Sequence, residues 1–428
     1  MMVVGPSRVV IEPHQRVTQS YGGIEGQIRV LLVISNLEYG GAQRQVVELC
    51  NNVDHERFDV HVCSLSDYVP LGVDIRNAST RLHVIEKRGK FDVTVVPRLA
   101  RLLKALDIDI VHSYLFDAEI AGRLAGRMAG TAAIVGSERN ADYVLKRRQL
   151  AAYRLTKRCV DLIVANSQAG ADFNSRMLGY DASMYRVVHN GVDVNRFVPA
   201  DGNRVRKALG IDEEEPVVGM FASFKRQKNH PMFFAAARRV LDRLPTARFV
   251  LVGDMLYGGM HGSDEYTGRM HRLVDELGIR NKCLLLGNRQ DVAELYTACD
   301  VTVLPSLFEG TPNVLLESMA CQVPVVVTDV SDNARIVRDA ETGFLVRLGD
   351  DERLADRLLH LLTEDNVRRA MGRAGREWVT AEFSTRALVR KTERVYIDVL
   401  STRTRASVKK GARGAHAVDR VDGAPDGS

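Results

Sequence analysis

The segment from Val301 to Asp329, VTVLPSLFEGTPNVLLESMACQVPVVVTD, constrains the fold more than any other part of the chain. It contains two strongly apolar, β-branched runs of the kind found in buried parallel strands. Between them lie a loop, marked by Pro305, Ser306 and Gly310, and then a helix. Strand, helix and strand in this order predict a parallel α/β sheet. Ligands of such sheets bind at the carboxyl ends of the strands, so the segment also predicts a binding site.

The start of the predicted helix favours an anion. Thr311 suits the N-cap, and Pro312 suits the first helical position, where its missing N–H costs nothing. A helix from Pro312 to about Cys321 leaves the amides near Asn313 and Val314 free. Such amides, with the helix dipole behind them, bind phosphate.

Two glutamates flank this helix end. Glu309 lies in the loop before the cap, and Glu317 lies in the second turn of the helix. Carboxylates are poor partners for phosphate, but they accept hydrogen bonds from sugar hydroxyls. Two glutamates at this spacing also occur in many proteins as one loop residue and one residue of a helix surface. A sugar-binding role for the two glutamates therefore depends on the flanking strands and on the Phe-Glu-Gly and Pro residues as well.

With these flanks, FEGTPNVLLES followed by MACQVPVVVTD resembles the E-x7-E signature of family 4 of the retaining, nucleotide-sugar-dependent glycosyltransferases. The resemblance implies the GT-B fold, an α/β fold with two Rossmann-like domains facing an interdomain cleft. It implies transfer of a hexosyl or N-acetylhexosaminyl group to a hydroxyl acceptor, without a metal or other cofactor. In the family the first glutamate, here Glu309, contacts the donor sugar, and the second, here Glu317, contacts the ribose. We expect the donor site to include Gly310, Thr311, Asn313 and Val314 as well.

The chain is long enough for two domains with separate cores, because it has 428 residues of which 45% are hydrophobic. Apolar runs predict strands at 28–35, 58–65, 82–85, 108–113, 132–136 and 161–166, and again at 217–222, 248–252, 283–286, 301–304 and 324–328. With the resemblance, these runs predict a disordered extension at 1–27, an acceptor-side domain at 28–193, a linker at 194–215, a nucleotide-sugar-binding domain at 216–382, a helix at 383–400 that crosses back to the first domain, and a disordered tail at 401–428.

A glycine pair, Gly40 and Gly41, follows the first predicted strand and opens a helix from about Ala42. A tight turn between a strand and a helix needs glycine whether or not a ligand is present. In the family, however, a glycine-rich loop at this position lies against the donor phosphates and the acceptor. We therefore expect Gly41 to contact the donor.

A basic cluster follows the first predicted strand of the second domain. Lys225, Arg226 and Lys228 would stabilise the charge on a departing diphosphate. Members of the family usually have Gly-Arg where this chain has Ala222 and Ser223. We assign catalytic roles to Lys228, to Arg226 as the substitute cation and to Glu309, although surface basic clusters are often only solvated.

Candidates on the acceptor side lie at the ends of two strands of the first domain. His112 ends one predicted strand and would face the acceptor, although a lone histidine is as often a hydrogen-bonded core residue. Many relatives carry a catalytic histidine after the next strand, where this chain has Glu138, Arg139 and Asn140. These three residues are candidate contacts of acceptor or sugar, but no family role transfers to them.

Two acidic residues, Asp107 and Asp109, match the metal-binding DxD of another glycosyltransferase fold. They precede a strand instead of following one, so we expect no metal there. The sequence also has no GxGxxG after a strand, which disfavours a dinucleotide-dependent oxidoreductase.

Residues 143–158, YVLKRRQLAAYRLTKR, resemble a cationic amphipathic helix. Such a surface binds anionic lipid headgroups, and a lipid-linked acceptor would give that binding a purpose; a solvated helix face has the same composition. No nucleic-acid recognition module accompanies the charge. The N-terminus has no signal-peptide pattern and no apolar run is long enough to cross a bilayer, so we expect a cytoplasmic protein, peripheral on the inner face of the membrane.

Two other functions fit parts of the pattern. One is another GT-B enzyme, such as a relative of starch, glycogen or sucrose synthase or a nucleotide-sugar epimerase. The other is a protein that binds a nucleotide sugar without turning it over, which the serine at position 223 keeps open.

Overall fold

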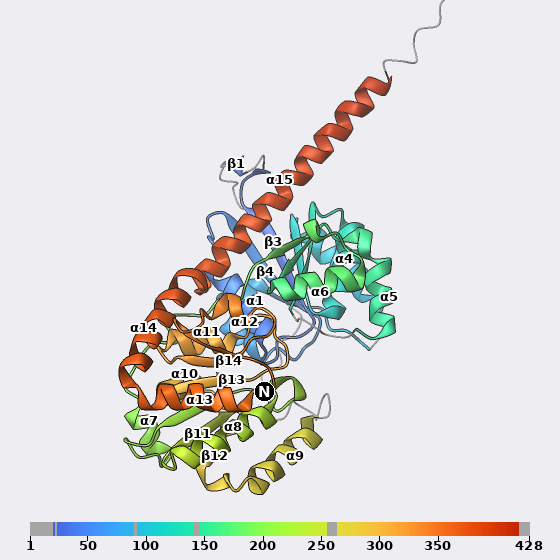
Figure 1. Cartoon of the computed structure of the whole chain (residues 1–428). Helices are drawn as coiled ribbons and strands as arrows, with labels where there is room; N and C mark the ends of the chain where they lie inside the picture. The colour runs from blue at the N-terminus through green and yellow to red at the C-terminus, as the bar shows by residue number, and fades with distance from the viewer. Residues whose placement is uncertain (1–19, 22–23, 90–91, 140–144, 255–262, 419–428) are drawn as a thin grey trace, which may run out of the picture.

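The structure, a computed structural model, describes residues 20–21, 24–89, 92–139, 145–254 and 263–418. Two parallel β-sheets, each covered by helices on both faces, form two Rossmann-like units (Figure 1). The α/β fold predicted from the sequence is therefore confirmed.

The sheet of the first unit has the strand order β5-β4-β3-β6-β7-β8-β9, and all neighbouring strands are parallel. The chain runs outward from β3 to β5 and then returns to β6 on the other side of β3. The carboxyl ends of β3 and β6 therefore form a topological switch point, which is where such sheets bind ligands. The strands are β3 Ile28–Ile34, β4 Phe58–Ser64, β5 Leu82–Val84, β6 Ile110–Tyr114, β7 Ala133–Glu138, β8 Leu162–Ala165 and β9 Tyr185–Val187.

The second unit repeats this arrangement with the order β12-β11-β10-β13-β14-β15. Its switch point lies between β10 and β13. The strands are β10 Val217–Phe221, β11 Arg248–Val252, β12 Cys283–Leu285, β13 Val301–Leu304, β14 Val325–Thr328 and β15 Gly343–Val346. The sequence analysis did not identify β9 or β15, because both are edge strands of only three and four residues.

The helices that cover the sheets alternate with the strands. In the first unit they are α1 Gly41–Asn52, α2 Ala78–Arg81, α3 Val95–Ala105, α4 Phe116–Ala129, α5 Arg147–Leu155 and α6 Gln168–Leu178. In the second unit they are α7 Asn203–Ala208, α8 His230–Arg243, α9 Ser263–Glu276, α10 Val292–Thr297, α11 Asn313–Ala320, α12 Asn333–Ile336, α13 Asp351–Thr363 and α14 Asp365–Glu382.

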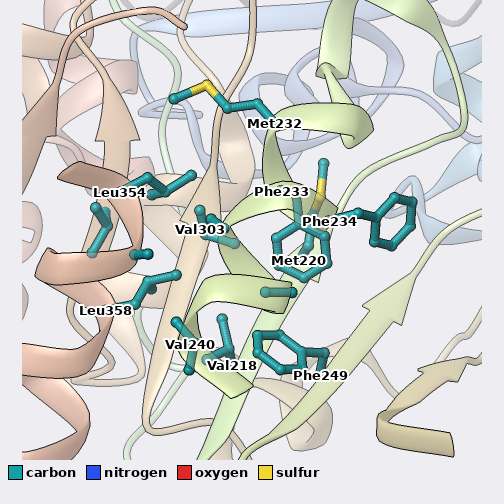
Figure 2. Close-up of a cluster of buried hydrophobic side chains, with 14 of the residues drawn as sticks. Val218, Met220, Met232, Phe233, Phe234, Val240, Phe249, Val303, Leu354 and Leu358 are labelled. Carbon is teal, nitrogen blue, oxygen red and sulfur yellow. The ribbon is translucent and has the colours of Figure 1, made fainter. Parts of the chain in front are cut away.

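Each unit has its own apolar core. In the second unit, α8 and α13 pack on one face of the sheet, where Phe233, Phe249 and Leu354 meet Val218 and Val303 (Figure 2). Burying side chains of this size contributes roughly 1.5–3 kcal/mol each. In the first unit, α3 and α4 cover one face of the sheet and α1 covers the other.

The helix α15, Thr385–Val418, returns from the second unit to the first (Figure 1). Leu388, Tyr396 and Val399 lie in the core of the first unit together with residues of α1. The helix continues past residue 400, so the prediction of a disordered tail from 401 is wrong as far as 418, and 419–428 lie outside the described residues.

The predicted disordered extension at 1–27 also contains structure. Strands β1 Ser20–Tyr21 and β2 Ile24–Glu25 pair antiparallel, and residues 1–19 and 22–23 lie outside the described part of the chain.

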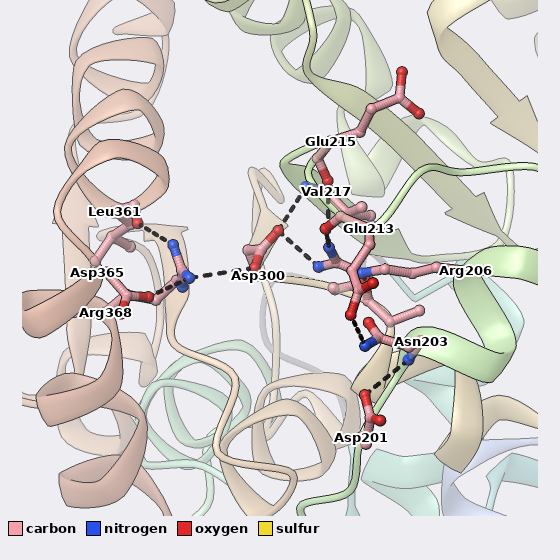
Figure 3. A network of polar contacts seen from close by, with 12 residues as sticks. Asp201, Asn203, Arg206, Glu213, Glu215, Val217, Asp300, Leu361, Asp365 and Arg368 are labelled. Carbon is pink, nitrogen blue, oxygen red and sulfur yellow. Dashed lines mark hydrogen bonds and ion pairs between the residues drawn. The ribbon is translucent and has the colours of Figure 1, made fainter.

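The second half of the predicted linker, 194–215, is built into the second unit. The guanidinium of Arg206, on α7, donates to Asp300 Oδ2 at 2.8 Å and to the carbonyls of Glu213 and Glu215 (Figure 3). Asp300 also accepts the Val217 amide at 2.8 Å and lies 3.6 Å from Arg368 of α14. This network fixes the linker against the first strand of the second sheet.

Candidate active site

The two switch points face each other across the junction of the units. A Cβ placed on Gly41, the first residue of α1, would lie 3.3 Å from Nδ2 of Asn313, the first residue of α11. The N-termini of two helices, one from each unit, therefore converge. The first amides of a helix have no intrahelical partner, and they carry the positive end of the dipole. Their convergence makes a site for a phosphorylated ligand.

Glu309 lies beside this junction with a 5% exposed surface. Its Oε1 is 2.5 Å from Nζ of Lys228 and accepts a hydrogen bond from Ser306 Oγ at 2.7 Å. Its backbone amide donates to Ser331 Oγ at 3.0 Å. The cation and the carboxylate assigned from the sequence thus form a direct ion pair, and hydrogen bonds fix the orientation of Glu309.

The loops that carry Lys228 and Glu309 are joined to each other. Gln227 accepts the Leu307 amide at 2.8 Å and donates its side-chain amide to the carbonyl of Phe308 at 2.8 Å. The side chain of Asn229 donates to the Pro305 carbonyl at 3.0 Å. Asn229 has a φ of 53°, a left-handed conformation that asparagine tolerates better than most residues. These bonds hold the two loops as one rigid surface.

Lys225 is the second cation near Glu309. Burial is the main cause that lowers its pKa, the charge of Lys228 lowers it further, and Glu309 opposes the shift. Arg226, which the sequence favoured as the substitute cation, is exposed on the 3-10 turn Arg226–Lys228. Lys225 is thus a partly buried cation that interacts electrostatically with Lys228 and Glu309, whereas Arg226 is exposed.

The start of α11 differs from the prediction. Pro312 is the N-cap rather than the first helical residue, and Thr311 does not cap the helix. The Thr311 hydroxyl instead donates to the carbonyl of Asn166 in the first unit. A Cβ on Gly310 would lie 2.9 Å from the Arg139 carbonyl, so the loop needs glycine there. Thr311 and Gly310 serve the contact between the units, and Asn313 and Val314 begin the helix.

Glu317 lies one helical turn deeper than Asn313. Its Oε2 accepts a hydrogen bond from the hydroxyl of Tyr296 at 2.9 Å. Burial raises the pKa of Glu317, whereas the Tyr296 hydrogen bond and the charges of Arg196 and Arg44 lower it. Tyr296 was not identified from the sequence, because nothing in its local pattern points to a functional role.

His112 does not face a cleft. The side chain is completely buried, with Nδ1 at 2.7 Å from the Tyr396 hydroxyl and Nε2 at 2.8 Å from Ser137 Oγ. Burial, and then the charge of Arg139, lowers its pKa well below the usual range. The hypothesis of acceptor contact is therefore wrong for His112, which links β6 to β7 and α15.

The other acceptor-side candidates lie near the junction. Glu138 is the last residue of β7, and Arg139 follows it. The Arg139 guanidinium donates to Asn190 Oδ1 at 3.1 Å and lies over the ring of Tyr114. Asn140 lies outside the described residues.

Asn190, which the sequence did not single out as a site residue, connects the units. Its Nδ2 donates to the Thr311 carbonyl at 3.0 Å and to Asn313 Oδ1 at 2.8 Å. Its place in the HNGVD segment is the signal from which it could have been found. Asn190 therefore helps to position the N-terminus of α11.

The two aspartates that resemble a metal motif lie at the amino ends of the central strands of the first sheet, opposite to the switch point. Asp109 accepts the Arg29 amide at 2.9 Å, and Asp107 pairs with the Arg29 guanidinium at 2.9 Å. Arg29 is at the amino end of β3, away from the switch point. Within the described residues, no cluster of three His, Cys, Asp or Glu side chains could hold a metal ion.

Comparison with known proteins agrees with this geometry. Residues 201–378 match the family described as Glycosyl transferases group 1, and residues 39–196 match Glycosyltransferase Family 4. The chain belongs to glycosyltransferase family 4. It is an enzyme that transfers a sugar from a nucleotide-sugar donor to an acceptor, as the sequence predicted.

Among curated members, the chain is 28% identical to the UDP-Gal:alpha-D-GlcNAc-diphosphoundecaprenol alpha-1,3-galactosyltransferase of Escherichia coli, over 84% of this chain and 94% of that protein. It is 27% identical to the N-acetyl-alpha-D-glucosaminyl L-malate synthase of Bacillus anthracis, over 72% and 80%.

Among solved structures of this fold, Anabaena Alr3699/HepE in complex with UDP-glucose superposes with a TM-score of 0.76. That match has 20% identity and covers 86% of this chain and all of the other. Because the identity is 20%, this structural similarity supports the GT-B fold alone.

Proposed function

We propose that this enzyme transfers a sugar from a UDP-sugar to a hydroxyl of a lipid-linked acceptor, with the anomeric configuration retained. The observation that carries the proposal is the ion pair of Lys228 and Glu309, which lies beside the converging N-termini of α1 and α11. A sugar diphosphate needs donors for its phosphates and acceptors for its hydroxyls. This junction offers both.

Each group then has a defined role. Lys228 and Lys225 stabilise the departing diphosphate, with Arg226 at the exposed rim, and the amides at Gly41, Asn313 and Val314 assist them. Glu309 accepts hydrogen bonds from the hydroxyls of the transferred sugar, and Glu317 accepts hydrogen bonds from the ribose. Gly310 and Thr311 keep the sugar-binding loop against the first unit, where Glu138 and Arg139 contact the acceptor.

These cations and helix ends supply the charge stabilisation that a metal ion gives in other enzymes, so we propose chemistry without a metal. The bond from the anomeric carbon to the phosphate oxygen breaks as the acceptor oxygen attacks the same face. The proton of the acceptor hydroxyl passes to the oxygen of the leaving phosphate. No protein base is needed for this step.

The test is release of nucleoside diphosphate from a panel of nucleotide sugars, with lipid-linked acceptors and in the presence of EDTA. Lys228→Ala should lower kcat by roughly 100- to 1000-fold, because one stabilising contact to the developing charge is lost. Glu309→Gln should also lower turnover strongly, and the exposed Glu352→Gln serves as control. Donor binding without turnover of any donor would indicate a non-catalytic binding protein instead.

The acceptor class rests on a second surface. The relative from E. coli is named for an acceptor on diphosphoundecaprenol. In this chain, α5 and the residues beside it expose Lys146, Arg147, Arg148, Arg154 and Arg158, with Leu155 85% exposed among them. Exposed cations around an apolar side chain favour an anionic lipid surface. We propose that this α5 surface docks on the membrane, as the sequence led us to expect for 143–158; residues 143 and 144 lie outside the described chain.

The surface of α4 next to α5 has the same character. Arg127 of α4 donates to the Arg158 carbonyl at 3.2 Å, and Met128 is 59% exposed. A hollow of about 540 Å³ lies between Arg127 of α4 and the residues that follow α5, among them Lys157 and Arg158. None of the described helices has the length and apolar character needed to cross a bilayer. We propose that a lipid acceptor is reached from the membrane surface.

Cosedimentation with vesicles tests the docking. The double variant Arg148→Glu/Arg154→Glu should reduce binding to anionic vesicles by roughly 10-fold or more, at about 1 kcal/mol per basic residue. Arg272→Glu/Arg373→Glu makes the same charge change on exposed residues of the second unit and should bind normally. Equal binding of both variants would exclude α5 as the docking surface.

A further inference from the structure

Tyr296 lies behind the proposed nucleotide site and has no role in the reaction described so far. We propose that Tyr296 is a positioning residue, which orients the Glu317 carboxylate so that it accepts hydrogen bonds from the ribose of the donor. The proposal rests on the proposed role of Glu317. It adds the residue on which ribose binding by Glu317 depends.

The contact between the two residues joins neighbouring helices. Tyr296 is on α10 and donates its hydroxyl to Glu317 Oε2, on α11, at 2.9 Å. In the described residues, the hydrogen bonds of the Glu317 side chain engage Oε2 alone. Hydrogen bonds to a carboxylate are about twice as strong as those between neutral groups. This bond therefore selects one orientation of the carboxylate and leaves Oε1 for a ligand.

The ring of Tyr296 is held independently of its hydroxyl. It is 0% exposed and stacks on Phe221, with ring centroids 3.8 Å apart and an interplanar angle of 20°. Phe197 packs edge-on against it, with centroids 6.0 Å apart. A phenylalanine at position 296 would keep these contacts and lose only the hydrogen bond. The hydroxyl can therefore be tested without disturbing the core.

The surroundings explain why the carboxylate needs such a partner. Burial disfavours the charged form of Glu317. The charges of Arg44, on α1, and Arg196, in the linker, favour the charged form. Without the hydroxyl of Tyr296, the carboxylate is free to turn toward these two cations and away from the nucleotide.

Phe221, against which Tyr296 stacks, is the last residue of β10. The loop that begins after it carries Lys225 and Lys228. The residue that orients the ribose contact thus packs against the strand that presents the phosphate contacts. The two halves of the nucleotide site share one rigid support.

The experiment compares the affinities of UDP and 2′,3′-dideoxy-UDP by calorimetry. The intact enzyme should prefer UDP by roughly 10- to 100-fold, the range expected for hydrogen bonds to a charged group. Tyr296→Phe should reduce that preference at least about fivefold, since the carboxylate is no longer oriented. A loss of packing would instead weaken both ligands equally and leave the ratio unchanged.

Two more variants make the outcome specific. Glu317→Gln should reduce the preference, and adding Tyr296→Phe to it should have no further effect, because both act through one contact. Tyr180→Phe removes a buried hydroxyl that bonds to Arg123 at 2.8 Å in the first unit, and it should keep the full preference. As the pH is lowered, the affinity for UDP should begin to fall at a higher pH in Tyr296→Phe than in the intact enzyme. The reason is that the hydrogen bond from Tyr296 lowers the pKa of Glu317, and the variant lacks this bond.

The results also separate this inference from the proposed function. If Glu317→Gln loses the preference but Tyr296→Phe keeps it, Tyr296 has no positioning role and the inference is overturned. If Glu317→Gln keeps the preference, the assignment of Glu317 to the ribose is wrong. Fully additive losses in the double variant would also contradict the inference.

Discussion

At the scale of single residues, a polar side chain has a structural role where the fold provides its hydrogen-bond partners, and it can belong to the site where it faces the junction of the units. His112 lies in the middle of the central strand β6, Glu309 lies in the loop that follows the central strand β13, and both side chains are nearly or fully buried. His112 has protein partners at both ring nitrogens, whereas Glu309 is paired with the cation that we assign to the diphosphate. Position in or just after a central strand therefore selects candidate residues, and their hydrogen-bond partners distinguish core residues from site residues.

His112 makes the folded state sensitive to acid. Its pKa is lowered in the folded state, so the unfolded chain takes up a proton first as the pH falls below about 6.5. Its contribution to stability is present above that pH and is lost below it. His112→Gln should reduce the loss of unfolding free energy between pH 7.5 and 5.5 by roughly 1 kcal/mol in denaturant titrations.

The exposed His271→Gln variant is the control for this measurement. An acid sensitivity that is identical in His112→Gln and the unchanged protein would contradict the assignment. Turnover at neutral pH should be retained in His112→Gln, since the side chain lies in the core rather than at the substrate.

At the scale of helices and strands, the sequence predicted the central strands well and the contacts between elements poorly. Runs such as 217–222 and 301–304 consist mainly of apolar and β-branched residues because both faces of a parallel sheet are buried, so composition alone marks them. Glu309 and Lys228 were found because they follow such runs. The capping role of Thr311 was wrong because its hydroxyl bonds to Asn166, which is far away in the sequence. Tyr296 was missed for the same reason.

The hydrogen bonds and ion pairs of Asp300 hold the linker, β10 and α14 together, and their contribution to stability can be tested (Figure 3). Asp300→Asn would leave Arg206 and Arg368, whose side chains are 12% and 22% exposed, without their shared carboxylate. We expect a loss of roughly 2–4 kcal/mol in unfolding free energy. Chemical denaturation measures it.

The matched substitution is Asp242→Asn, which breaks the exposed pair with Arg238 on α8. That change should cost less than about 0.5 kcal/mol. Similar losses in both variants would mean that the Asp300 network does not stabilise the linker.

At the scale of the whole molecule, Asp332 ties the second unit to the first. It is 1% exposed, and its carboxylate accepts the backbone amides of Gln168 and Ala169, at the N-terminus of α6, at 2.7 and 2.9 Å. It also lies 3.0 Å from Nε2 of His189. A carboxylate of one unit thus neutralises the helix end of the other, which favours the closed arrangement.

Asp332→Asn should loosen this arrangement. Burial alone would raise the pKa of Asp332, but its hydrogen bonds lower the pKa overall. The interaction of the Asp332 carboxylate with the first unit is therefore present above about pH 4 and weakens below it. We expect a larger radius of gyration by small-angle scattering for the variant at neutral pH, and faster hydrogen exchange at the start of α6. UDP should reduce the difference if closure accompanies binding.

A radius of gyration equal to that of the unchanged protein, with unchanged exchange in α6, would contradict this role. Asp339→Asn provides a control on the second unit alone, since Asp339 accepts the Leu345 amide within that unit.

The return of α15 to the first unit has a consequence for biosynthesis. The apolar face of α1 and its sheet is completed by residues 388–400, which leave the ribosome after both sheets have been made. The second unit can close its core earlier, while the first waits with an uncovered surface. During that interval the nascent chain exposes the kind of apolar surface that chaperones bind and that promotes aggregation. Fragments that end before residue 388 should therefore fail through misassembly of the first unit, the one that is translated first.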